Sequence, residues 1–327
     1  MSPLWLQPEP QQNAQWVRTG MQDWLHALVW WTQQDRRVEE DDMTRTLTLR
    51  QWLRTAVHPY CLVHVVAVVG VAVVDFHPNY PALTGALYLV MMFGITAGYH
   101  RYFSHRTFKT SRPVQFAFAV LGNLSCQKSP LWWAAHHRHH HRFSDEEEDV
   151  HSPTRHGLIW SHMGWFLSDI HKDTKHELVR DLTKYPELQW MDRNPYLLPV
   201  GLAALLATFG GTGALVWGFF LTIVLVWHCT FTINSLAHVW GTRRYNTTDT
   251  SKNNFVLALL TLGEGWHNNH HRYMNSTRQG FFWWEIDVAY CILKVMSWVG
   301  LVWDIRPVPE SVLRPKPKGP MLDAKPA

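Results

Sequence analysis

Hydrophobic residues along the chain gather in long blocks that alternate with polar stretches. The first block, residues 59–76, reads PYCLVHVVAVVGVAVVDF, and after the short loop HPNYP a second block covers residues 82–99. A second pair covers residues 196–213 and 214–233, with the turn GGTG at 210–213. Because a helix rises about 1.5 Å per residue, about 20 apolar residues cross the roughly 30 Å hydrocarbon core of a bilayer. The pattern predicts four transmembrane helices arranged as two hairpins.

Lysine and arginine distinguish these blocks from the core helices of a soluble protein, which is the alternative explanation. Of the 30 Lys and Arg residues, six precede the first block, thirteen lie between the two hairpins and eleven follow the fourth block. The blocks and the hairpin loops contain none. Since cytoplasmic segments of membrane proteins are enriched in Lys and Arg, both termini and the central segment are predicted to be cytoplasmic.

The remaining segments complete the predicted organisation. Two shorter apolar runs, residues 114–124 and 289–303, are predicted to be helices at the membrane surface, where tryptophan is favoured. We expect an N-terminal cytoplasmic segment over 1–58, one domain over 59–305 and a flexible C-terminal tail over 306–327. The expected fold class is an all-α membrane protein with a cytoplasmic helical domain.

Composition and charge exclude several other classes. The net charge is only +4 and no basic tract is interleaved with aromatic residues, so nucleic acid is not an expected partner. The four cysteines lie far apart and are expected to be free thiols. No basic segment followed by an apolar core opens the chain, so we expect no cleavable signal peptide. Histidine is abundant, with 21 residues, and it carries the candidate chemistry.

The histidines form four groups on the predicted cytoplasmic side of the membrane. Two of these groups share the spacing HxxHH: His137, His140, His141 and His267, His270, His271. On an α-helix the positions i+3 and i+4 lie on the same face as i, so each motif presents three imidazoles to one side. His136 and His139 lie off this face, and we leave them out of the predicted metal set.

The other two groups depend more on the backbone. Asn234 and His238 are four residues apart at the end of the fourth block and share a helix face. His100 and His105 are five apart, about 140° around a regular helix, so they converge only if a bulge or a helix end lies between them. Nine imidazoles exceed the coordination of one ion, which predicts two metal ions. Iron, zinc, copper and nickel all suit imidazole, and spacing does not choose among them.

The stretches HRYFSHRTFK, HHRHHHRFSDEEEDVHSPTRHG, INSLAHVWGTRRY and GEGWHNNHHRY resemble, in order and spacing, those of membrane fatty acid desaturases. The resemblance is to the Δ9 acyl-CoA and acyl-lipid branch, which is stearoyl-CoA desaturase-like, and it runs from about residue 58 to 305. It implies a four-span fold with a cytoplasmic di-iron centre. One iron would be held by His100, His105, His137, His141 and His271. The other would be held by His140, His238, His267 and His270, with Asn234 reaching it through a water.

Carboxylates close to these motifs are candidates for orienting the ligands. A metal-bound histidine usually donates its second ring N–H to a carboxylate or a carbonyl. Four residues could fill this role: Asp145, Glu146, Asp149 and Glu264. The alternative is that the acidic run at 145–149 is simply solvated.

The resemblance also implies a reaction. A mid-chain CH₂ has no acidic proton, so no separate acid or base residue is expected, and its oxidation requires a metal and O₂. Two iron ions would use O₂ and two external electrons to introduce a cis double bond, at Δ9 by resemblance. The haem-domain motif HPGG is absent from the sequence. We therefore expect an external donor, a ferredoxin or a cytochrome b5-type protein with its reductase.

Seven residues are candidates for contacting a fatty acyl-CoA or acyl-lipid substrate: Thr230, Phe231, Trp160, Trp165, Arg155, Lys172 and Lys175. Thr230 and Phe231 come one turn before Asn234, where the family's substrate tunnel bends, although ordinary helix packing explains them equally well. The two tryptophans either line the cavity or anchor at the membrane interface, and we expect the interface position. The three cations could contact an anionic head group, although surface lysines more often have no specific role.

Two alternatives remain at this stage. A related hydroxylase, acetylenase or alkane oxygenase would use the same iron site, but the HRYFSH and NSLAH contexts favour desaturation. A histidine-rich metal transporter would need ligands along the spans, where only His64 and His228 lie and form no spaced series. The acyl carrier, the chain length and the donor stay open. We expect a multi-pass protein of a bacterial inner membrane.

Overall fold

The computed structural model describes residues 57–314. The predicted N-terminal segment therefore lies outside the described residues except at its last two positions, and so does the predicted tail from residue 315. The described elements are α3 (Val57–Val73), α4 (Asn79–Phe93), η1 (Gly94–Ser104), β1 (Lys109–Thr110), α5 (Arg112–Asn123), α6 (Pro130–Phe143), α7 (Pro153–His156), η2 (Trp160–Gly164), α8 (Trp165–Leu167), η3 (Asp169–His171), η4 (His176–Leu178), α9 (Arg180–Thr183), α10 (Pro186–Arg193), α11 (Leu197–Leu215), η5 (Val216–Leu221), α12 (Thr222–Asn234), α13 (Leu236–Val239), α14 (Phe255–Leu260), α15 (His267–Arg272), α16 (Val288–Trp298), β2 (Val302–Trp303) and α17 (Glu310–Leu313).

The described chain is mostly helical, as predicted. It also contains a small antiparallel pair in which β1 and β2 place Lys109 opposite Trp303 and Thr110 opposite Val302. The four cysteines are free thiols, which confirms that prediction. The two runs predicted as surface helices correspond to α5 and α16.

The first predicted hairpin consists of α3 and α4. Pro78 stands immediately before α4. Because proline has no backbone N–H to donate, it is tolerated at the start of a helix but not inside one, so α4 begins after it. From Asn79 the helix continues through α4 and η1 without a break to Ser104, over 26 residues. The helix that contains the second predicted block thus extends beyond the apolar residues, and the HRYFS stretch lies at its end.

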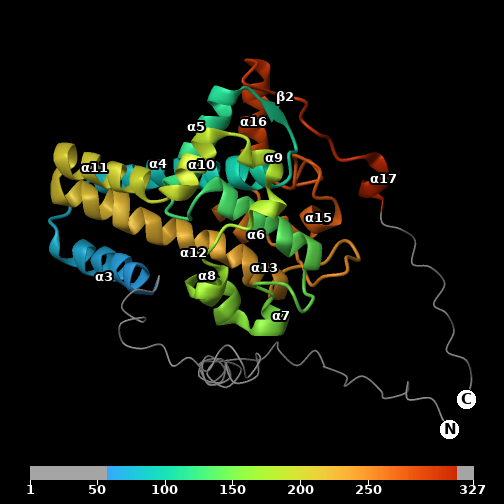
Figure 1. Cartoon of the computed structure of the whole chain (residues 1–327), viewed down its shortest axis with the longest axis horizontal. Helices are drawn as coiled ribbons and strands as arrows, with labels where there is room; N and C mark the ends of the chain where they lie inside the picture. The colour runs from blue at the N-terminus through green and yellow to red at the C-terminus, as the bar shows by residue number, and fades with distance from the viewer. Residues whose placement is uncertain (1–56, 315–327) are drawn as a thin grey trace, which may run out of the picture. The chain divides into compact units, whose positions relative to one another are not determined.

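The second predicted hairpin turns at a glycine. Gly211 has φ 69° and ψ −170°, a backbone conformation outside the helical region that suits a residue without Cβ. A Cβ added to Gly218 would lie 3.3 Å from Leu206 Cδ1, whereas twelve residues of one straight helix would separate these positions by about 18 Å. The chain therefore folds back at Gly211, within the predicted turn, and α11 lies beside η5 and α12 (Figure 1).

The outer faces of these helices are apolar. Within residues 57–314, Asn79–Ser104 and Leu197–Val239 are the stretches long and apolar enough to cross a membrane, and α3 and α16 contain shorter apolar helices. Val68 on α3 is 72% exposed and Phe209 on α11 is 83% exposed. Because water-facing surfaces rarely carry broad apolar patches, these faces fit contact with lipid.

Beyond the hairpins, η1 supports two further helices. It packs against α5 and α6, with Tyr99, Phe103 and Phe118 fully buried in the shared core. A Cβ on Gly122 would lie 2.4 Å from the ring of Tyr99, so only glycine lets α5 approach η1 this closely. The side chain of His100 therefore projects from a closely packed part of the backbone.

Candidate metal centre

The backbone irregularity that the sequence required between His100 and His105 is present. Residues Gly94–Ser104 form a π-helix, and the His105 N–H donates to the His100 carbonyl at 3.2 Å. An i→i+5 bond places residues five apart one above the other, as i+4 does in an α-helix. The two imidazole centroids lie 4.8 Å apart as a result.

The two HxxHH motifs lie on separate helices whose starts are set by local sequence. In α6, the Ser129 hydroxyl accepts the Trp132 N–H at 3.0 Å and Pro130 occupies the first turn, where its missing N–H costs nothing. This start places the first motif in the last two turns of α6. The second motif forms nearly all of α15, which begins at His267.

Nine histidines converge as two groups, each with one ring nitrogen per residue within 4.8 Å of the others. The first histidine group consists of His100, His105, His137, His141 and His270. The second histidine group consists of His140, His238, His267 and His271. A third set of His140, Asp149 and His151 shares His140 with the second group.

This arrangement corrects the division that the resemblance implied, because His270 and His271 exchange places. On an α-helix, residues i and i+4 lie about 40° apart, whereas i+3 lies about 100° from i+4. In both motifs the i and i+4 histidines stay together, and the i+3 histidine, His140 or His270, joins the other group. Each helix thus contributes to both groups in the same way.

Within the groups it is the Nε2 atoms that approach one another. In the first group they are 2.8 Å apart between His105 and His137, 2.9 Å between His141 and His270 and 3.1 Å between His100 and His270. In the second group they are 3.1 Å apart between His238 and His267. Two nitrogens bound to one ion at about 2.1 Å in neighbouring octahedral positions are about 3.0 Å apart. The spacing fits shared metal ligation.

Carboxylates contact the opposite ring nitrogens. His140 Nδ1 donates to Asp149 Oδ1 at 2.9 Å, and His100 Nδ1 pairs with Glu264 Oε2. A carboxylate at Nδ1 fixes the tautomer that leaves the Nε2 lone pair free for a metal. Two of the predicted carboxylates therefore lie where such support is needed.

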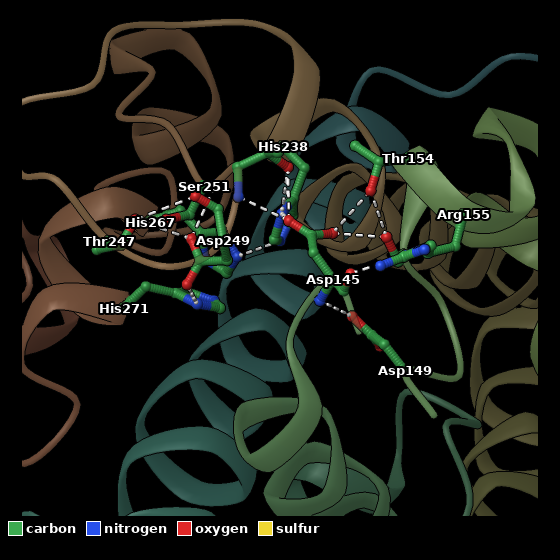
Figure 2. A network of polar contacts seen from close by, with 12 residues as sticks. Asp145, Asp149, Thr154, Arg155, His238, Thr247, Asp249, Ser251, His267 and His271 are labelled. Atoms are coloured by element: carbon green, nitrogen blue, oxygen red, sulfur yellow. Dashed lines mark hydrogen bonds and ion pairs between the residues drawn. The ribbon is translucent and has the colours of Figure 1, made fainter. Parts of the chain in front are cut away.

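Two further carboxylates support the second histidine group (Figure 2). His271 Nδ1 donates to Asp249 Oδ2 at 2.8 Å, and Asp249 itself accepts the Ser251 N–H at 2.9 Å. His238 Nδ1 lies 3.5 Å from Asp145 Oδ2, which also accepts the Thr250 hydroxyl at 2.7 Å. Sequence reasoning found Asp145 and missed Asp249.

The predicted set also contained Glu146, and the structure corrects that choice. Its side chain is exposed, one residue after Asp145, which is turned inward. Asp145 has φ 62°, a left-handed conformation that Asp tolerates, and its N–H donates to Asp149 Oδ2 at 2.8 Å. This turn directs Asp145 and Asp149 toward the histidines and leaves Glu146 in solvent.

A buried arginine holds Glu264 in place. Arg101 is 1% exposed, and its guanidinium contacts Glu264 Oε1 at 3.2 Å and Asp287 Oδ1 at 2.9 Å. Gln279 Nε2 donates to the other Glu264 oxygen at 3.0 Å. Burial raises the pKa of Glu264, but His100 and Arg101 lower it more, and the net shift is downward. Glu264 is therefore ionised beside His100.

Electrostatics keeps most of the imidazoles neutral. Burial lowers the pKa of His137 well below its usual range, and His100 lowers it further. Burial is also the main cause of the lowered pKa of His105, His141, His267 and His270. Burial acts the same way on His140, but Asp149 outweighs it and the pKa of His140 is raised. Neutral imidazole is the metal-binding form.

A second observation, an unpartnered ring nitrogen, also indicates that the histidine groups suit transition-metal ions. His271 Nε2 is buried and has no hydrogen-bond partner among the described residues, although Asp249 holds the other nitrogen of the ring. A buried nitrogen left without a partner is unfavourable unless a ligand completes it. The groups lack thiolates and have only nitrogen donors facing inward, which suits imidazole-binding metals such as iron.

Asn234 lies beside the centre in a small cavity. The cavity has a volume of about 30 Å³, and its lining includes the imidazoles of His137, His140 and His267 and apolar side chains such as Ile233. A water needs roughly 10–15 Å³ of such space. The predicted water between Asn234 and a metal therefore has room.

The histidines that were left out of the metal set do lie outside both groups. His136 is buried against Trp132, whose carbonyl contacts its Nδ1 at 2.9 Å. His139 Nε2 contacts the Glu148 carbonyl at 2.9 Å. Helical periodicity separated these two from their three neighbours correctly.

The structure separates the seven substrate candidates into different environments. Thr230 lines the small cavity, and its hydroxyl accepts from Gln127 Nε2 at 3.2 Å. Phe231 is buried in the core beside Phe166. Trp165 is 6% exposed and stacks on Trp132, which excludes the interface position favoured for it. The others lie elsewhere: Trp160 donates to the Val150 carbonyl, Arg155 donates to the Asp145 carbonyl, Lys172 is exposed and Lys175 is half-buried.

Comparison with known proteins agrees with this geometry. The model of the fatty acid desaturase family matches residues 78–293. The chain is 39% identical over 225 residues to a probable chloroplastic lipid desaturase of Arabidopsis thaliana, an alignment that covers 68% of this chain and 62% of that protein.

Two further relatives are similar over more of their own length. The sn-1 stearoyl-lipid 9-desaturase of Anabaena variabilis is 36% identical over 242 residues, which is 73% of this chain and 84% of that protein. The acyl-CoA C20 Δ5-desaturase of Anemone leveillei is 36% identical over 236 residues, which is 71% of this chain and 75% of that protein. The chain belongs to the fatty acid desaturase family.

Proposed function

We propose that this protein is an O₂-dependent fatty acyl desaturase that introduces a cis double bond into a saturated acyl chain at a histidine-ligated di-iron centre. One observation carries the proposal. Nine imidazoles form two groups, with four carboxylates at the ring nitrogens that face away from the groups. At the four rings that these carboxylates contact, the hydrogen on Nδ1 leaves the Nε2 lone pair free for an ion.

The charge of the surrounding residues supports two divalent ions. Four carboxylates contact the ligand rings, and they carry four negative charges that two divalent cations would balance. Arg101 and Asp287, which are also buried, are neutral as a pair. Iron and copper are the imidazole-binding metals that support O₂ chemistry, and we propose iron because the chain belongs to the fatty acid desaturase family, whose resemblance implies a di-iron centre.

The residues of this chain hold and orient the reactants. When bound, the two iron ions would supply the oxidising power that is needed to remove two hydrogens from adjacent CH₂ groups. This oxidising power would come from O₂ and two electrons. Asp149 and Asp249 keep the Nδ1–H of His140 and His271 in place, so the rings cannot rotate away from the centre. Met92 and Ile95 line the same cavity as the imidazoles and add apolar surface suited to a CH₂ group.

We also propose the complete membrane topology, with four spans arranged as two hairpins and both termini and the centre on the cytoplasmic side. The fold-back at Gly211 and the apolar outer faces of α3 and α11 support it. Electrons would come from an external ferredoxin or a cytochrome b5-type protein. Cysteine-reactive probes at introduced loop positions, applied from each side of the membrane, test this topology.

The relatives' names leave two substrate classes for this chain. One relative is named for lipid-linked stearoyl chains at position 9 and another for a CoA-linked chain at position 5. We propose Δ9 desaturation of an acyl lipid, with acyl-CoA as the alternative carrier. Thr230 is the candidate for controlling where the chain enters the centre, because it lines the cavity beside Asn234.

The test is expression in a desaturase-deficient host, followed by gas chromatography–mass spectrometry of its lipids. We expect a new cis-monounsaturated chain and iron in the purified protein, and His140→Ala should remove the product while membrane insertion persists. A hydroxylated or acetylenic product would favour the related oxygenases. Metal uptake without any new double bond would favour transport, and no product with iron and donor present would overturn the proposal.

A further inference from the structure

The second HxxHH motif places two asparagines, Asn268 and Asn269, between its histidines, and both are fully buried. Asparagine is unfavourable inside a helix, because its side chain competes with the backbone for hydrogen bonds. The helix α15 has only six residues, and isolated helices shorter than about 12–15 residues are marginal in water. The position of the ligands on α15 must therefore come from contacts with the rest of the protein.

Asn268 attaches α15 to the loop of residues 243–251. Its Oδ1 accepts the backbone N–H groups of Arg244 at 2.9 Å and Tyr245 at 2.7 Å. Its Nδ2 donates to the Tyr245 carbonyl at 3.1 Å. Residues 243–251 form no helix or strand, so these contacts replace the backbone pairing that such elements would provide.

The same side chain is connected with the carboxylate that supports His271. Asn268 Nδ2 donates to Thr247 Oγ1 at 3.3 Å, and the Thr247 hydroxyl donates to Asp249 Oδ1 at 3.0 Å. The other oxygen of Asp249, Oδ2, accepts from His271 Nδ1 at 2.8 Å (Figure 2). Through one hydroxyl and one carboxylate, Asn268 therefore reaches a ligand of the second histidine group.

Asn269 attaches α15 to a different segment, residues 279–285. Its Nδ2 donates to the Gln279 carbonyl at 2.9 Å and to Glu285 Oε2 at 2.8 Å. Its Oδ1 accepts from Asn253 Nδ2 at 2.8 Å, and its backbone N–H donates to Asn253 Oδ1 at 3.1 Å. Both hydrogens of the amide and its oxygen are thus engaged, as a buried polar group requires.

The contact with Gln279 leads to the first histidine group. Gln279 Nε2 donates to Glu264 Oε2 at 3.0 Å, and Glu264 pairs with His100 Nδ1. Asn269 holds the backbone from which the Gln279 side chain extends. Asn269 is therefore connected with a ligand of the first group, whereas Asn268 is connected with a ligand of the second.

The first HxxHH motif shows that such contacts are not a general property of the spacing. His139 occupies in α6 the position that Asn269 occupies in α15, but it is only half-buried and its ring contacts one carbonyl, that of Glu148. The helix α6 has 14 residues and a cap at Ser129, so it needs less support from other segments. The two buried amides are specific to the short helix.

We propose that Asn268 and Asn269 are positioning residues, of which the former sets the ligand geometry of the second histidine group and the latter that of the first. This role rests on the proposed di-iron function. Each asparagine acts through the carboxylate support of its own group. With one asparagine removed, the other still holds α15, so each substitution is expected to weaken one ion and spare the other.

The first test measures metal binding by purified protein and does not depend on desaturation. Fe²⁺ is titrated without O₂ into His141→Ala, which keeps the second site, and into His271→Ala, which keeps the first. Adding Asn268→Ala should weaken the ion of His141→Ala about tenfold, as loss of a supporting residue does, and should leave the ion of His271→Ala unchanged. Adding Asn269→Ala should do the reverse. Any other pattern, such as equal loss at both sites or no loss, would overturn the proposal.

Aspartate variants give a second test that keeps the size of the side chain. Asn268→Asp retains the oxygen that accepts two backbone N–H groups, so it should bind the second ion more tightly than Asn268→Ala does. Asn269→Asp places a carboxylate against Glu285 in a buried position, where like charges repel, so it should bind the first ion no better than Asn269→Ala does. Equal behaviour of the two aspartates would contradict these contacts.

Hydrogen–deuterium exchange of the metal-free protein measures the attachments directly. We expect faster exchange over residues 243–251 in Asn268→Ala and over residues 279–285 in Asn269→Ala, and His139→Ala, the matched control on α6, should change neither segment. Unchanged exchange in both segments would refute the role of the two amides. If the wild-type protein binds two ions but makes no unsaturated product, the desaturase proposal fails, whereas these measurements still decide what the asparagines do.

Discussion

The protein uses histidine in two regions that differ in how the rings are arranged and what supports them. In the metal centre, nine histidines converge from four helices, η1 with its C-terminal cap His105, α6, α13 and α15, and carboxylates contact the opposite ring nitrogens of four of them. The second region is the three-histidine chain of His64, His228 and His162, in which the ring nitrogens contact one another in line and a carbonyl and a hydroxyl oxygen contact the two ends. Convergence with carboxylate support suits cation binding, whereas in the linear series each ring nitrogen already has a partner within the protein.

The largest effect is expected where convergence is broken. His270→Ala removes a ligand from the first histidine group and His271→Ala removes one from the second, so each should abolish desaturation. Iron analysis sharpens the comparison. Each single variant should lose mainly one of the two ions, and combining His270→Ala with His141→Ala, in the same group, should cost no further iron. If that pair lost both ions, the division into groups would be wrong.

The next largest effect is expected at Arg101, which has no counterpart in the three-histidine chain. Arg101→Met leaves Glu264 and Asp287 buried without their cation. Removing one partner from a buried ion network destabilises a protein by about 3–5 kcal/mol. Denaturant unfolding of the purified protein measures this loss.

Arg112→Met serves as the control for that experiment. Arg112 pairs with Glu187 at the surface, with its side chain 60% exposed, so solvent replaces the lost contact and we expect little change. An equal loss of stability in both variants would show that burial of the Arg101 network is not what matters.

A smaller effect is expected when carboxylate support is removed and the ligand is kept. Asp249→Asn preserves the shape beside His271 but removes the charge that favours the Nδ1–H tautomer. Loss of such a partner typically costs 10–100-fold in metal affinity or activity. Metal titration of the variant against Glu146→Gln, an exposed carboxylate of the same acidic region, measures the difference. Equal affinities would assign Asp249 a purely structural role.

The sequence contained much of the centre because helical spacing is a local property. The two HxxHH motifs each had to present three imidazoles on one face, and the gap between His100 and His105 required a backbone irregularity, which is the π-helix η1. The i and i+4 rule would also have predicted the exchange of His270 and His271. The two ligand sets implied by the family resemblance did not follow this rule.

Other parts of the molecule depend on contacts that local patterns do not encode. Asp249 lies in a loop 22 residues before His271, and no periodicity relates the two. His64 and His228 are 164 residues apart, and they meet because α3 packs on α12. The turn at Gly211 was readable because two adjacent glycines interrupt an apolar block, which is again a local signal.

The smallest effect is expected at His139, which tests whether ring direction, and not histidine content, defines the centre. His139 lies between His137 and His140 in sequence, but its Nε2 contacts the Glu148 carbonyl at 2.9 Å outside both groups. His139→Ala should lose about 1 kcal/mol of stability or less, the value of one hydrogen bond, and should keep its iron and its activity. Iron content and product yield measured beside His140→Ala make the comparison direct, since the two residues are neighbours on one helix. Loss of iron from His139→Ala would mean that the rings of α6 do not point as this structure places them, and the separation of the nine ligands from the remaining histidines would fail with it.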